Sequence, residues 1–308
     1  MTERVRYRTF MFDSARWDGF EFRSGDIIIS TSPKCGTTWT QMLCALLIFQ
    51  DPDLARPLSE ISPWFDQQLR TRDAVVALLD AQEHRRFIKT HTPFDGLPHD
   101  DGVTYLCVGR DPRDVFVSMD HHWQNMDMDV VRRTRDAAVG NSDAEELLSR
   151  SSLVSRPGDV HERFRAWVDN ELPPEQVASS LRAALHHVAT FWDERDRGNV
   201  ALFHYADLEA DLVGEMQRLA GGLEIDVSSE RIGELATAAG FRAMKERSRQ
   251  LVPNLAIWRD SAAFFHQGES GQWRALLDDD DLADYETTVH ELVAAELAQW
   301  VHHGWRGN

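Results

Sequence analysis

The segment Asp26–Trp39, DIIISTSPKCGTTW, decides the fold that this chain is expected to adopt. Its apolar run, Ile27–Ile29, predicts a buried strand that ends at Ser30. A short loop follows, and the mostly apolar sequence Thr37–Phe49 predicts a helix. A strand that runs through a loop into a helix directs backbone N–H groups and the positive end of the helix dipole at one place. We therefore expect a phosphate or sulfate group to bind at this loop.

Three further apolar segments predict parallel strands beside the first one. They are Arg86–Lys89, Thr104–Gly109 and Val200–His204, and helical or irregular sequence separates each from the next. Such spacing requires crossover connections, so we predict an α/β fold with a P-loop-like central parallel sheet and helices on both of its faces. Residues 1–308 are expected to form a single domain. Ligands of such sheets bind at the carboxyl ends of the strands.

Capping residues and periodicity predict the helices. Asp111 can cap a helix that Pro112 opens at its first position. The segment from Asn125 to Leu172 is polar and weakly periodic, which indicates either a mobile lid or, as the preferred interpretation, a loop-rich insertion. The other predicted helices are Ala74–Leu79, Gln176–Arg195, Leu208–Ala220, Glu230–Ala238 and Asp281–Val301.

Composition limits the classes of function. The formal charge of −18 argues against nonspecific binding to nucleic acid or to an anionic membrane. The first ten residues do not form a signal peptide, and the longest apolar run, Met42–Phe49, is too short to span a bilayer. The three cysteines lack the spacing of a disulfide framework or a zinc site. A cytoplasmic protein with no nucleic-acid partner and no stable membrane insertion is expected.

Basic and imidazole side chains follow the first two predicted strands. Lys34 precedes Gly36 in the first loop, so the loop is not a Walker A motif, in which the lysine follows the second glycine. Lys89 and His91 end the second strand. The imidazole could act as a general base because its ordinary pKa lies near neutrality. Taken singly, a surface lysine and a solvated histidine remain the alternatives.

The third predicted strand ends at an arginine. Arg110 could present its planar guanidinium to a phosphate, and Ser118, two helical turns further on, could add a neutral donor. An ion pair between Arg110 and Asp111 or Asp114 is the simpler alternative for this arginine alone.

The motifs SPKCGTTW, KTH and GRDPRDVFVS, in this order, resemble the cytosolic-type sulfotransferases that use 3′-phosphoadenosine 5′-phosphosulfate (PAPS). The likeness continues in HHVATFWDE, HYADLEAD, GFRAMK and FFHQGESGQW, and it extends from about Phe20 to Trp273. Each motif alone is moderately specific, whereas the ordered set is strongly so.

The resemblance implies an enzyme that moves the sulfuryl group of PAPS to a hydroxyl, or as a second choice an amine, of a small lipophilic molecule or a glycolipid. The transfer would be in-line and would need no metal. His91 would be the general base, with Lys34 and Lys89 beside the transferring group. The residues implied in donor binding are Lys34, Cys35, Gly36, Thr37, Thr38, Trp39, Arg110, Ser118, Tyr205, Phe241, His266, Gln267 and Gly268.

One departure from the family's pattern concerns the 3′-phosphate. Where relatives carry Arg-Lys-Gly, this chain has His266, Gln267 and Gly268, so two cations are lost. A charge-assisted hydrogen bond is stronger than a neutral one. We expect weaker donor binding than is typical, or compensation by another basic residue, for which the candidates are Arg259, Arg242 and Lys245.

A second departure concerns self-association. The family's dimerisation segment is replaced by a stretch from Arg274 that runs into four consecutive aspartates, Asp278–Asp281. Like charges would face each other across a two-fold axis. We therefore expect a monomer, or a dimer through another interface, with the aspartates in a solvated turn before the last helix.

The acceptor pocket is expected to be apolar and to lie beside His91, which would suit a hydrophobic alcohol or phenol. Many of the candidate residues could instead belong to the core. They are Trp17, Phe20, Trp64, Phe65, His121, His122 and Trp123.

Two other functions stay open. A P-loop-like nucleotide kinase is disfavoured because the chain has no Walker A lysine and no evident metal-binding acidic set. A non-catalytic PAPS- or nucleotide-binding protein is suggested by the missing cations at positions 266 and 267. The presence of Lys34, Lys89 and His91 argues against it, because a pure binder needs no base.

Overall fold

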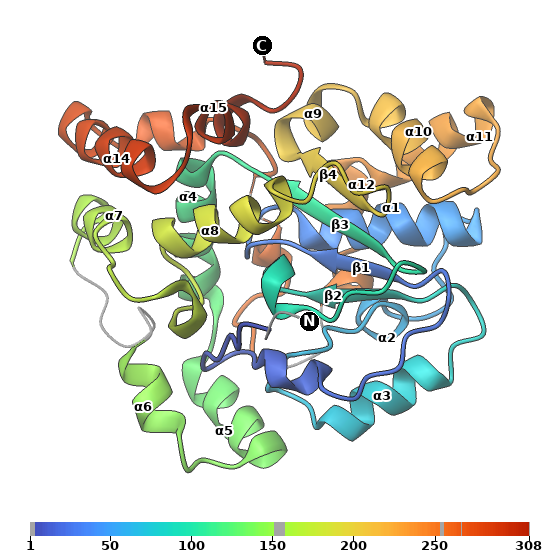
Figure 1. Ribbon diagram of the computed structural model, residues 1–308, viewed down its shortest axis with the longest axis horizontal. Helices are drawn as coiled ribbons and strands as arrows, with labels where there is room; N and C mark the ends of the chain where they lie inside the picture. Colours follow the sequence, from blue (N-terminus) through green and yellow to red (C-terminus); the bar gives the residue numbers. More distant parts are fainter. Residues whose placement is uncertain (1–3, 151–157, 253–255, 266, 308) are drawn as a thin grey trace.

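A four-stranded parallel sheet forms the centre of the computed structural model, which describes residues 4–150, 158–252, 256–265 and 267–307. Its strands are β1 (Ile27–Ser30), β2 (Phe87–Thr90), β3 (Thr104–Gly109) and β4 (Val200–His204), in the order β2-β1-β3-β4. The predicted sheet is confirmed (Figure 1). Strand β2 lies one residue later than expected, because its pairing with β1 runs from Phe87 to Thr90.

Alternate residues of the strands face opposite layers, as the pleat of a strand requires. One face carries Ile28, Ile88, Tyr105 and Cys107, and the other carries Ile27, Ile29, Phe87, Leu106 and Val108. Both sets are buried, which explains why the strands read as continuous apolar runs rather than alternating ones.

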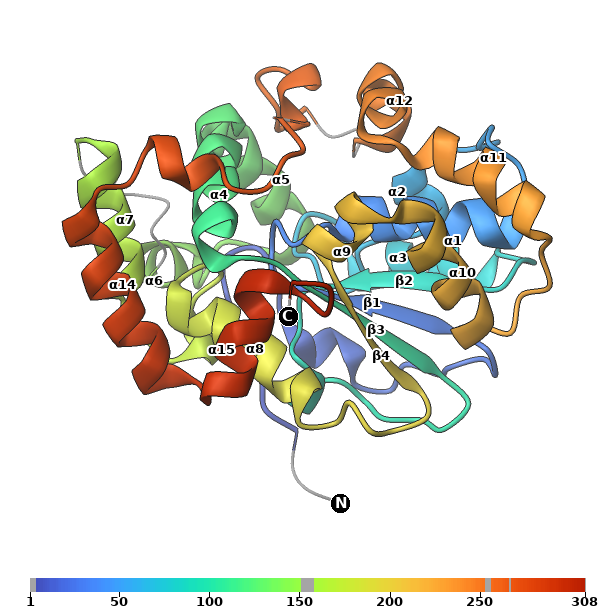
Figure 2. The same cartoon turned by 90° about the horizontal axis from the view of Figure 1, so that it is seen from above.

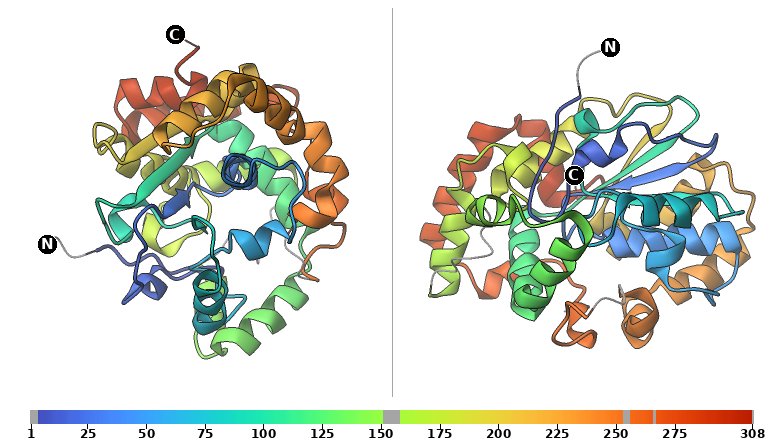
Figure 3. Two further views of the ribbon diagram at one scale, coloured as in Figure 1. Left: turned by 90° about the vertical axis from the view of Figure 1, so that its right-hand side faces the viewer. Right: turned by 90° about the horizontal axis from the view of Figure 1, so that it is seen from below.

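Helices cover both faces of the sheet, as also seen from two further sides in Figure 3. Helices α8 and α15 pack on the first face, with α4, α7 and α14 against α8, and α1, α10 and α11 lie over the second face (Figure 2). Within the described ranges, no helix combines the length and the apolar composition needed to cross a bilayer. The helices are α1 (Thr37–Phe49), α2 (Leu58–Ile61), α3 (Arg72–Asp80), α4 (Pro112–Asn125), α5 (Met128–Val139), α6 (Ala144–Ser149), α7 (Val160–Val168), α8 (Leu181–Trp192), α9 (Tyr205–Ala210), α10 (Leu212–Gly222), α11 (Ser229–Ala239), α12 (Phe241–Glu246), α13 (Ser248–Leu251), α14 (Asp279–Leu292) and α15 (Ala295–His303).

Side-chain caps set helix ends that the periodicity did not reveal. Helix α1 spans the predicted residues, and Asp111 caps α4 by accepting a hydrogen bond from the amide of Arg113. The predicted helix Leu208–Ala220 is divided, because Asp211 leaves the helical conformation and caps α10. The predicted helix Gln176–Arg195 begins only after Ser180, which caps α8.

The acidic run Asp278–Asp281 belongs to a helix rather than to a solvated turn. Asp278 caps α14 in a capping box with Asp281, and the acidic side chains lie in the first turn, where the helix dipole favours negative charge. Asp281 is buried and accepts hydrogen bonds from His161 and Arg165. The predicted helix Asp281–Val301 is divided where Val293 becomes extended, which gives α14 and α15.

The segment from Asn125 to Leu172 is mainly helical in its described part, so the expectation of a loop-rich insertion is wrong there. It contains α5, α6 and α7, and Asp127 and Asp159 cap α5 and α7. A few buried apolar residues, such as Val131 and Phe164, dock these helices among many polar ones. Residues 151–157 lie outside the described part. That the segment acts as a lid stays a prediction.

The order of the strands fixes where a ligand would bind. After β1 the chain forms β2 on one side of it, and then crosses to form β3 on the other side. The crevice at the carboxyl ends of β1 and β3 is therefore the topological switch point, which is the ligand site of open α/β sheets. The first loop follows β1, and Arg110 follows β3.

Candidate active site

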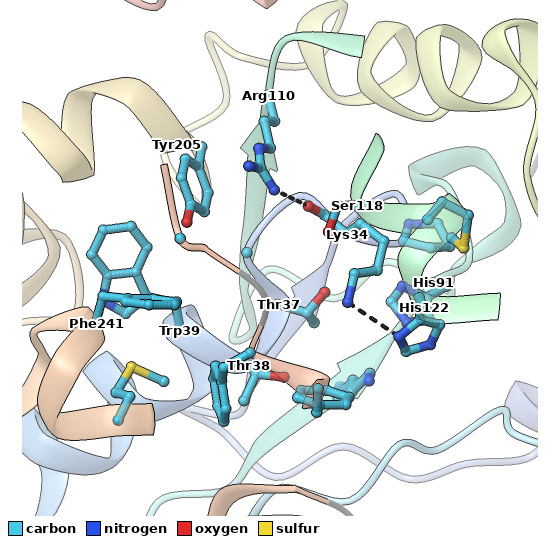
Figure 4. Close-up of a pocket in the computed structure, with 18 of the residues that line it drawn as sticks. Lys34, Thr37, Thr38, Trp39, His91, Arg110, Ser118, His122, Tyr205 and Phe241 are labelled. Carbon is cyan, nitrogen blue, oxygen red and sulfur yellow. Dashed lines mark hydrogen bonds between the residues drawn. The ribbon is translucent and has the colours of Figure 1, made fainter. Parts of the chain in front are cut away.

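A cavity of about 500 Å³ lies at the carboxyl ends of the strands and collects nearly all of the predicted site residues. Cys35 does not line it, and His266 lies outside the described residues. Figure 4 shows the labelled side chains converging on this space. The predicted residues that line it are Lys34, Gly36, Thr37, Thr38, Trp39, Lys89, His91, Arg110, Ser118, Tyr205, Phe241, Gln267 and Gly268.

The first loop has the conformation of an anion cradle. Lys34 and Gly36 both have positive φ, of 71° and 99°, and a Cβ on Gly36 would lie 3.1 Å from Cδ2 of Tyr205. Gly36 is the N-cap of α1, and no side chain caps this helix. The first amides of α1, starting at Thr37, are therefore free of a capping side chain and can donate to an anion.

Cys35 faces the core rather than the cavity. Its thiol is buried beneath the sheet, and burial raises the pKa of this thiol to about 12. Its amide donates to the carbonyl of Ser32 at 3.3 Å. The thiol therefore does not line the cavity, and donor binding at Cys35 stays a prediction that would involve its backbone.

Two lysines approach the centre of the cavity without an ion-pair partner in the described part of the chain. Burial and the nearby cations Arg110 and Lys89 lower the pKa of Lys34 to about 7. Burial lowers the pKa of Lys89 to about 8, although the charge of Asp66 opposes this shift. The Lys34 ammonium donates to Nδ1 of His122 at 3.2 Å. In their charged form the two lysines thus make this part of the cavity positive, and no described carboxylate contacts either ammonium.

His91 presents the free lone pair of a neutral imidazole. Its Nδ1 lies 2.7 Å from the carbonyl oxygen of Thr31, which can only accept, so Nδ1 carries the proton and Nε2 is the basic nitrogen. Burial, together with the charge of Lys89, lowers the pKa of His91 well below its ordinary value. His91 is therefore neutral at pH 7, the state in which it can accept a proton.

Asp66 holds the turn that carries His91, and sequence reasoning did not identify it. Its buried carboxylate accepts hydrogen bonds from the hydroxyls of Thr90 and Thr92 on either side of the histidine, and from Nε1 of Trp64. The Trp64 ring packs edge-on against His91 with centroids 4.8 Å apart, and the Lys89 ammonium lies 4.8 Å from its centre. The Asp66 carboxylate thus holds in place both the turn that carries His91 and the Trp64 ring beside it.

Arg110 joins the two ends of the cavity instead of pairing with a neighbouring aspartate. It donates to the carbonyl of Lys34 at 3.0 Å and to that of Glu269 at 3.3 Å, and its guanidinium stacks 4.0 Å from the Tyr205 ring centre. Its Nε is buried and has no hydrogen-bond partner among the residues that the structure describes.

The two aspartates named as alternative partners of Arg110 are engaged elsewhere. Asp111 pairs with Arg113, and Asp114 accepts from the amides of Gly271 and Gln272. The ion-pair alternative for Arg110 is therefore wrong.

Aromatic rings, those of Trp39, Tyr205 and Phe241, line another part of the cavity. Trp39 donates through Nε1 to the carbonyl of Ala239 at 2.9 Å and meets Tyr205 edge-on at 5.2 Å between centroids. Gly268 has a φ of 71°, and a Cβ on it would lie 2.0 Å from Cδ2 of Phe241. The close approach of this loop to Phe241 therefore requires glycine.

None of the three residues proposed to replace the missing cations lines the cavity. The Arg242 side chain is 94% exposed and pairs with Glu246, and the Arg259 side chain donates to the carbonyl of Met126. Lys245 lies above the Phe241 ring at 5.8 Å. Within the described residues, the expected compensation is not found, and the cavity's strong cations are Lys34, Lys89 and Arg110.

The part of the cavity beside His91 is apolar. Among the residues expected there, Trp64, His122 and Trp123 line it, whereas Trp17, Phe20 and Phe65 pack together in the core. His121 is not part of the lining. Sequence reasoning also missed several apolar residues of the lining. Phe264 begins the FFHQGESGQW motif, whereas the others come from distant segments with no motif and include Met11, Phe12, Leu69, Met126, Ile257 and Trp258.

Comparison with known proteins finds a matching family and relatives over most or all of the chain. Residues 24–296 match the model of the sulfotransferase domain family. A glycolipid sulfotransferase of Mycobacterium tuberculosis is 44% identical over 100% of this chain and 97% of its own length. Human sulfotransferase 2B1 is 26% identical over 82% of this chain and 62% of the human protein.

Solved structures show the same fold. Retinol dehydratase in complex with androsterone and the inactive cofactor PAP superposes with a TM-score of 0.68 at 20% identity, over 92% of this chain and 84% of that chain. A mouse sulfotransferase complexed with PAP gives a TM-score of 0.68 at 18% identity, over 93% of this chain and 90% of that chain.

Proposed function

The chain belongs to the sulfotransferase family, and on that premise we propose that it moves the sulfuryl group of PAPS to a hydroxyl of a small lipophilic molecule or a glycolipid. The observation that carries the proposal is the meeting of Lys34, Lys89 and a neutral His91 beside the uncapped start of α1. An anion cradle and a base at one point suit transfer of an anionic group to a hydroxyl.

The residues present fit the nucleotide donor. The amides that begin α1 and the Lys34 ammonium would bind the 5′-phosphosulfate, and the unpartnered Nε of Arg110 is suited to an anion such as the 3′-phosphate. Ser118 would add a neutral donor there. PAPS supplies the sulfuryl group when bound. The rings of Trp39, Tyr205 and Phe241 would contact the adenine.

His91 would take the proton of the acceptor hydroxyl at Nε2. The hydrogen bond from Nδ1 to the Thr31 carbonyl holds the ring in the required tautomer, and it stabilises the imidazolium that forms. Lys89 would stabilise negative charge on the group in transfer, and Lys34 would stabilise it on the leaving phosphate oxygen. Positioned cations suffice for such catalysis because the transition state of this kind of transfer is loose.

The walls of the cavity support a lipophilic acceptor. Trp64, Trp123, Met126 and Trp258 surround the space next to His91, and a relative of 44% identity is named a glycolipid sulfotransferase. We infer that the lipid or aromatic part of the acceptor lies against these side chains. We also infer a cytoplasmic enzyme that is a monomer or a dimer through a non-family interface.

A transfer assay tests the proposal. Purified protein would be incubated with ³⁵S-labelled PAPS and a panel of phenols, sterols and glycolipids, with products resolved by chromatography and mass. Sulfation of a lipophilic hydroxyl is expected. Tight PAP binding without transfer to any acceptor would favour the non-catalytic binder, and magnesium-dependent ATP hydrolysis would favour the kinase.

Donor binding is expected to weaken by more than about tenfold between pH 7 and pH 9. Lysine is a cation only below its pKa, and the pKa values of about 7 and about 8 for Lys34 and Lys89 place their loss of charge in this range. Arg110 stays charged, and the phosphates of PAP are already ionised above pH 7. Calorimetry of PAP binding in two buffers of different ionisation enthalpy would detect the accompanying proton uptake. An affinity that is constant from pH 7 to pH 9 would contradict these pKa values.

Gln267→Lys is expected to tighten PAP binding by about tenfold, because a charge-assisted hydrogen bond replaces a neutral one at the cavity wall. Gln217→Lys adds the same charge at an exposed position of α10 and serves as the control. Dissociation constants from calorimetry would decide. Equal affinities of Gln267→Lys and wild type would show that donor binding does not depend on charge there.

A further inference from the structure

A second imidazole, that of His122, lies in the same cavity and contacts the lysine of the first loop. The Lys34 ammonium donates to Nδ1 of His122 at 3.2 Å, the hydrogen bond drawn in Figure 4. The same ammonium lies 4.9 Å from the centre of the Phe264 ring. Within the described ranges, no carboxylate pairs with Lys34, and the side-chain hydrogen-bond partner of its ammonium is this imidazole.

The sequence places His122 where one helix can serve both ends of the site. His122 follows Ser118 by four residues in α4, so the two side chains lie on one face of the helix, one turn apart. The rings of Trp258 and Phe264 pack against His122 at 4.8 Å and 5.7 Å between centroids and limit its rotation. Nδ1 of His122 is therefore held in place by residues that do not belong to the first loop, which carries Lys34.

When Lys34 carries its charge, the contact fixes the tautomer of His122. An ammonium can only donate, so Nδ1 of His122 carries the lone pair and the proton lies on Nε2. The charged or titratable groups that face His122 are Lys34, Lys89 and His91, and with burial they hold the pKa of His122 well below its ordinary value. The imidazole is neutral at pH 7 and remains an acceptor.

We propose that His122 is a positioning residue for sulfuryl transfer, one that holds the Lys34 ammonium at the oxygen that leaves with the nucleotide. The inference rests on the proposed function. A lysine side chain has many rotamers, and a displacement of about 1 Å at a reacting centre can lower a rate by about 100-fold. A rigid acceptor for one of the three ammonium hydrogens leaves the other two directed into the cavity.

Two substitutions distinguish this positioning role from that of a side chain that only lines the cavity. His122→Phe keeps a ring and removes the acceptor, and is expected to lower kcat by about 10- to 100-fold. His122→Asn keeps an acceptor near the position of Nδ1. Its kcat is expected to stay within about threefold of wild type, because the amide oxygen can accept the hydrogen bond of the Lys34 ammonium. His290→Phe on an exposed part of α14 controls for the loss of an imidazole.

A double-mutant cycle shows whether the effect passes through Lys34. In a Lys34→Met background, His122→Phe is expected to have no further effect on kcat. An equal reduction of kcat with and without Lys34 would overturn the proposal, as would His122→Asn being as slow as His122→Phe. Absence of transfer by the wild type would instead refute the proposed function.

A spectroscopic readout does not need turnover. The chain has three lysines, Lys34, Lys89 and Lys245, so selective isotope labelling gives a simple NMR spectrum in which Lys34→Met identifies one signal. His122→Phe is expected to shift the Lys34 signal and to lower its titration midpoint, because the ammonium loses its acceptor. The Lys245 signal is expected to stay unchanged. An unmoved Lys34 signal would overturn the proposal.

Discussion

His91→Ala is expected to lower the rate of sulfuryl transfer by between about 10² and 10⁴ while PAP affinity changes by less than about twofold. The mutation removes Nε2, the lone pair that would accept the proton of the acceptor hydroxyl. It leaves the amides of α1 and the Arg110 guanidinium in place, and these are the groups assigned to the nucleotide. Single-turnover kinetics at saturating PAPS, with calorimetry of PAP binding, would measure both quantities.

His91→Asn is the matched control for this experiment. Its amide nitrogen can occupy the position of Nδ1 and donate to the Thr31 carbonyl, but it offers no base at the position of Nε2. We expect it to be folded and as slow as His91→Ala. Substantial activity in His91→Asn would mean that the hydrogen bond to Thr31, rather than proton transfer, is what the reaction needs. Comparable loss of binding and rate would mean that His91 is structural.

Lys34→Met is expected to lower kcat by between about 10² and 10³, with a smaller effect on PAP affinity. Methionine keeps much of the apolar stem and removes the charge that would stabilise the leaving phosphate oxygen. The effect is larger on the rate because that charge develops as the sulfur–oxygen bond breaks. Arg132→Met, an exposed substitution in α5, controls for loss of one positive charge.

The result that would contradict this role of Lys34 is a parallel loss of rate and affinity. It would show that the lysine binds the ground state and the transition state equally. Lys34→Arg adds a second comparison. Its charge is kept, but a planar guanidinium cannot occupy the same space between His122 and the Phe264 ring, so only a partial recovery of kcat is expected.

The sheet and the first loop were predictable because their signals are local. Each strand is one continuous apolar run, and Asp111 and Pro112 mark the start of α4 within two residues. The loop at Lys34 and Gly36 follows a strand directly, so its position in a parallel sheet follows from the topology. The interruption at Asp211 was not predictable from periodicity, because a single capping side chain decides it.

The rest of the site depends on contacts between distant parts of the chain. Asp66 meets Thr90 and Thr92 across more than twenty residues, and nothing in its own sequence neighbourhood indicates these two buried donors. The wall formed by Phe12 and Trp258 joins segments from opposite ends of the chain. Cys35 shows a second limit of prediction from sequence. Its place in the motif does not reveal that the loop, which has positive φ angles, directs the Cys35 side chain into the core.

The bridge made by Arg110 has a consequence for the order in which the enzyme becomes competent during synthesis. Its guanidinium spans from the carbonyl of Lys34 to that of Glu269, and Gly268 seats the later segment against Phe241. A nascent chain that has left the ribosome only as far as β4 already contains the four strands of the described sheet and His91, the proposed base. It still lacks the segment around Gly268 and Glu269, one side of the proposed nucleotide site, so we expect that donor binding can assist folding only after this segment has emerged.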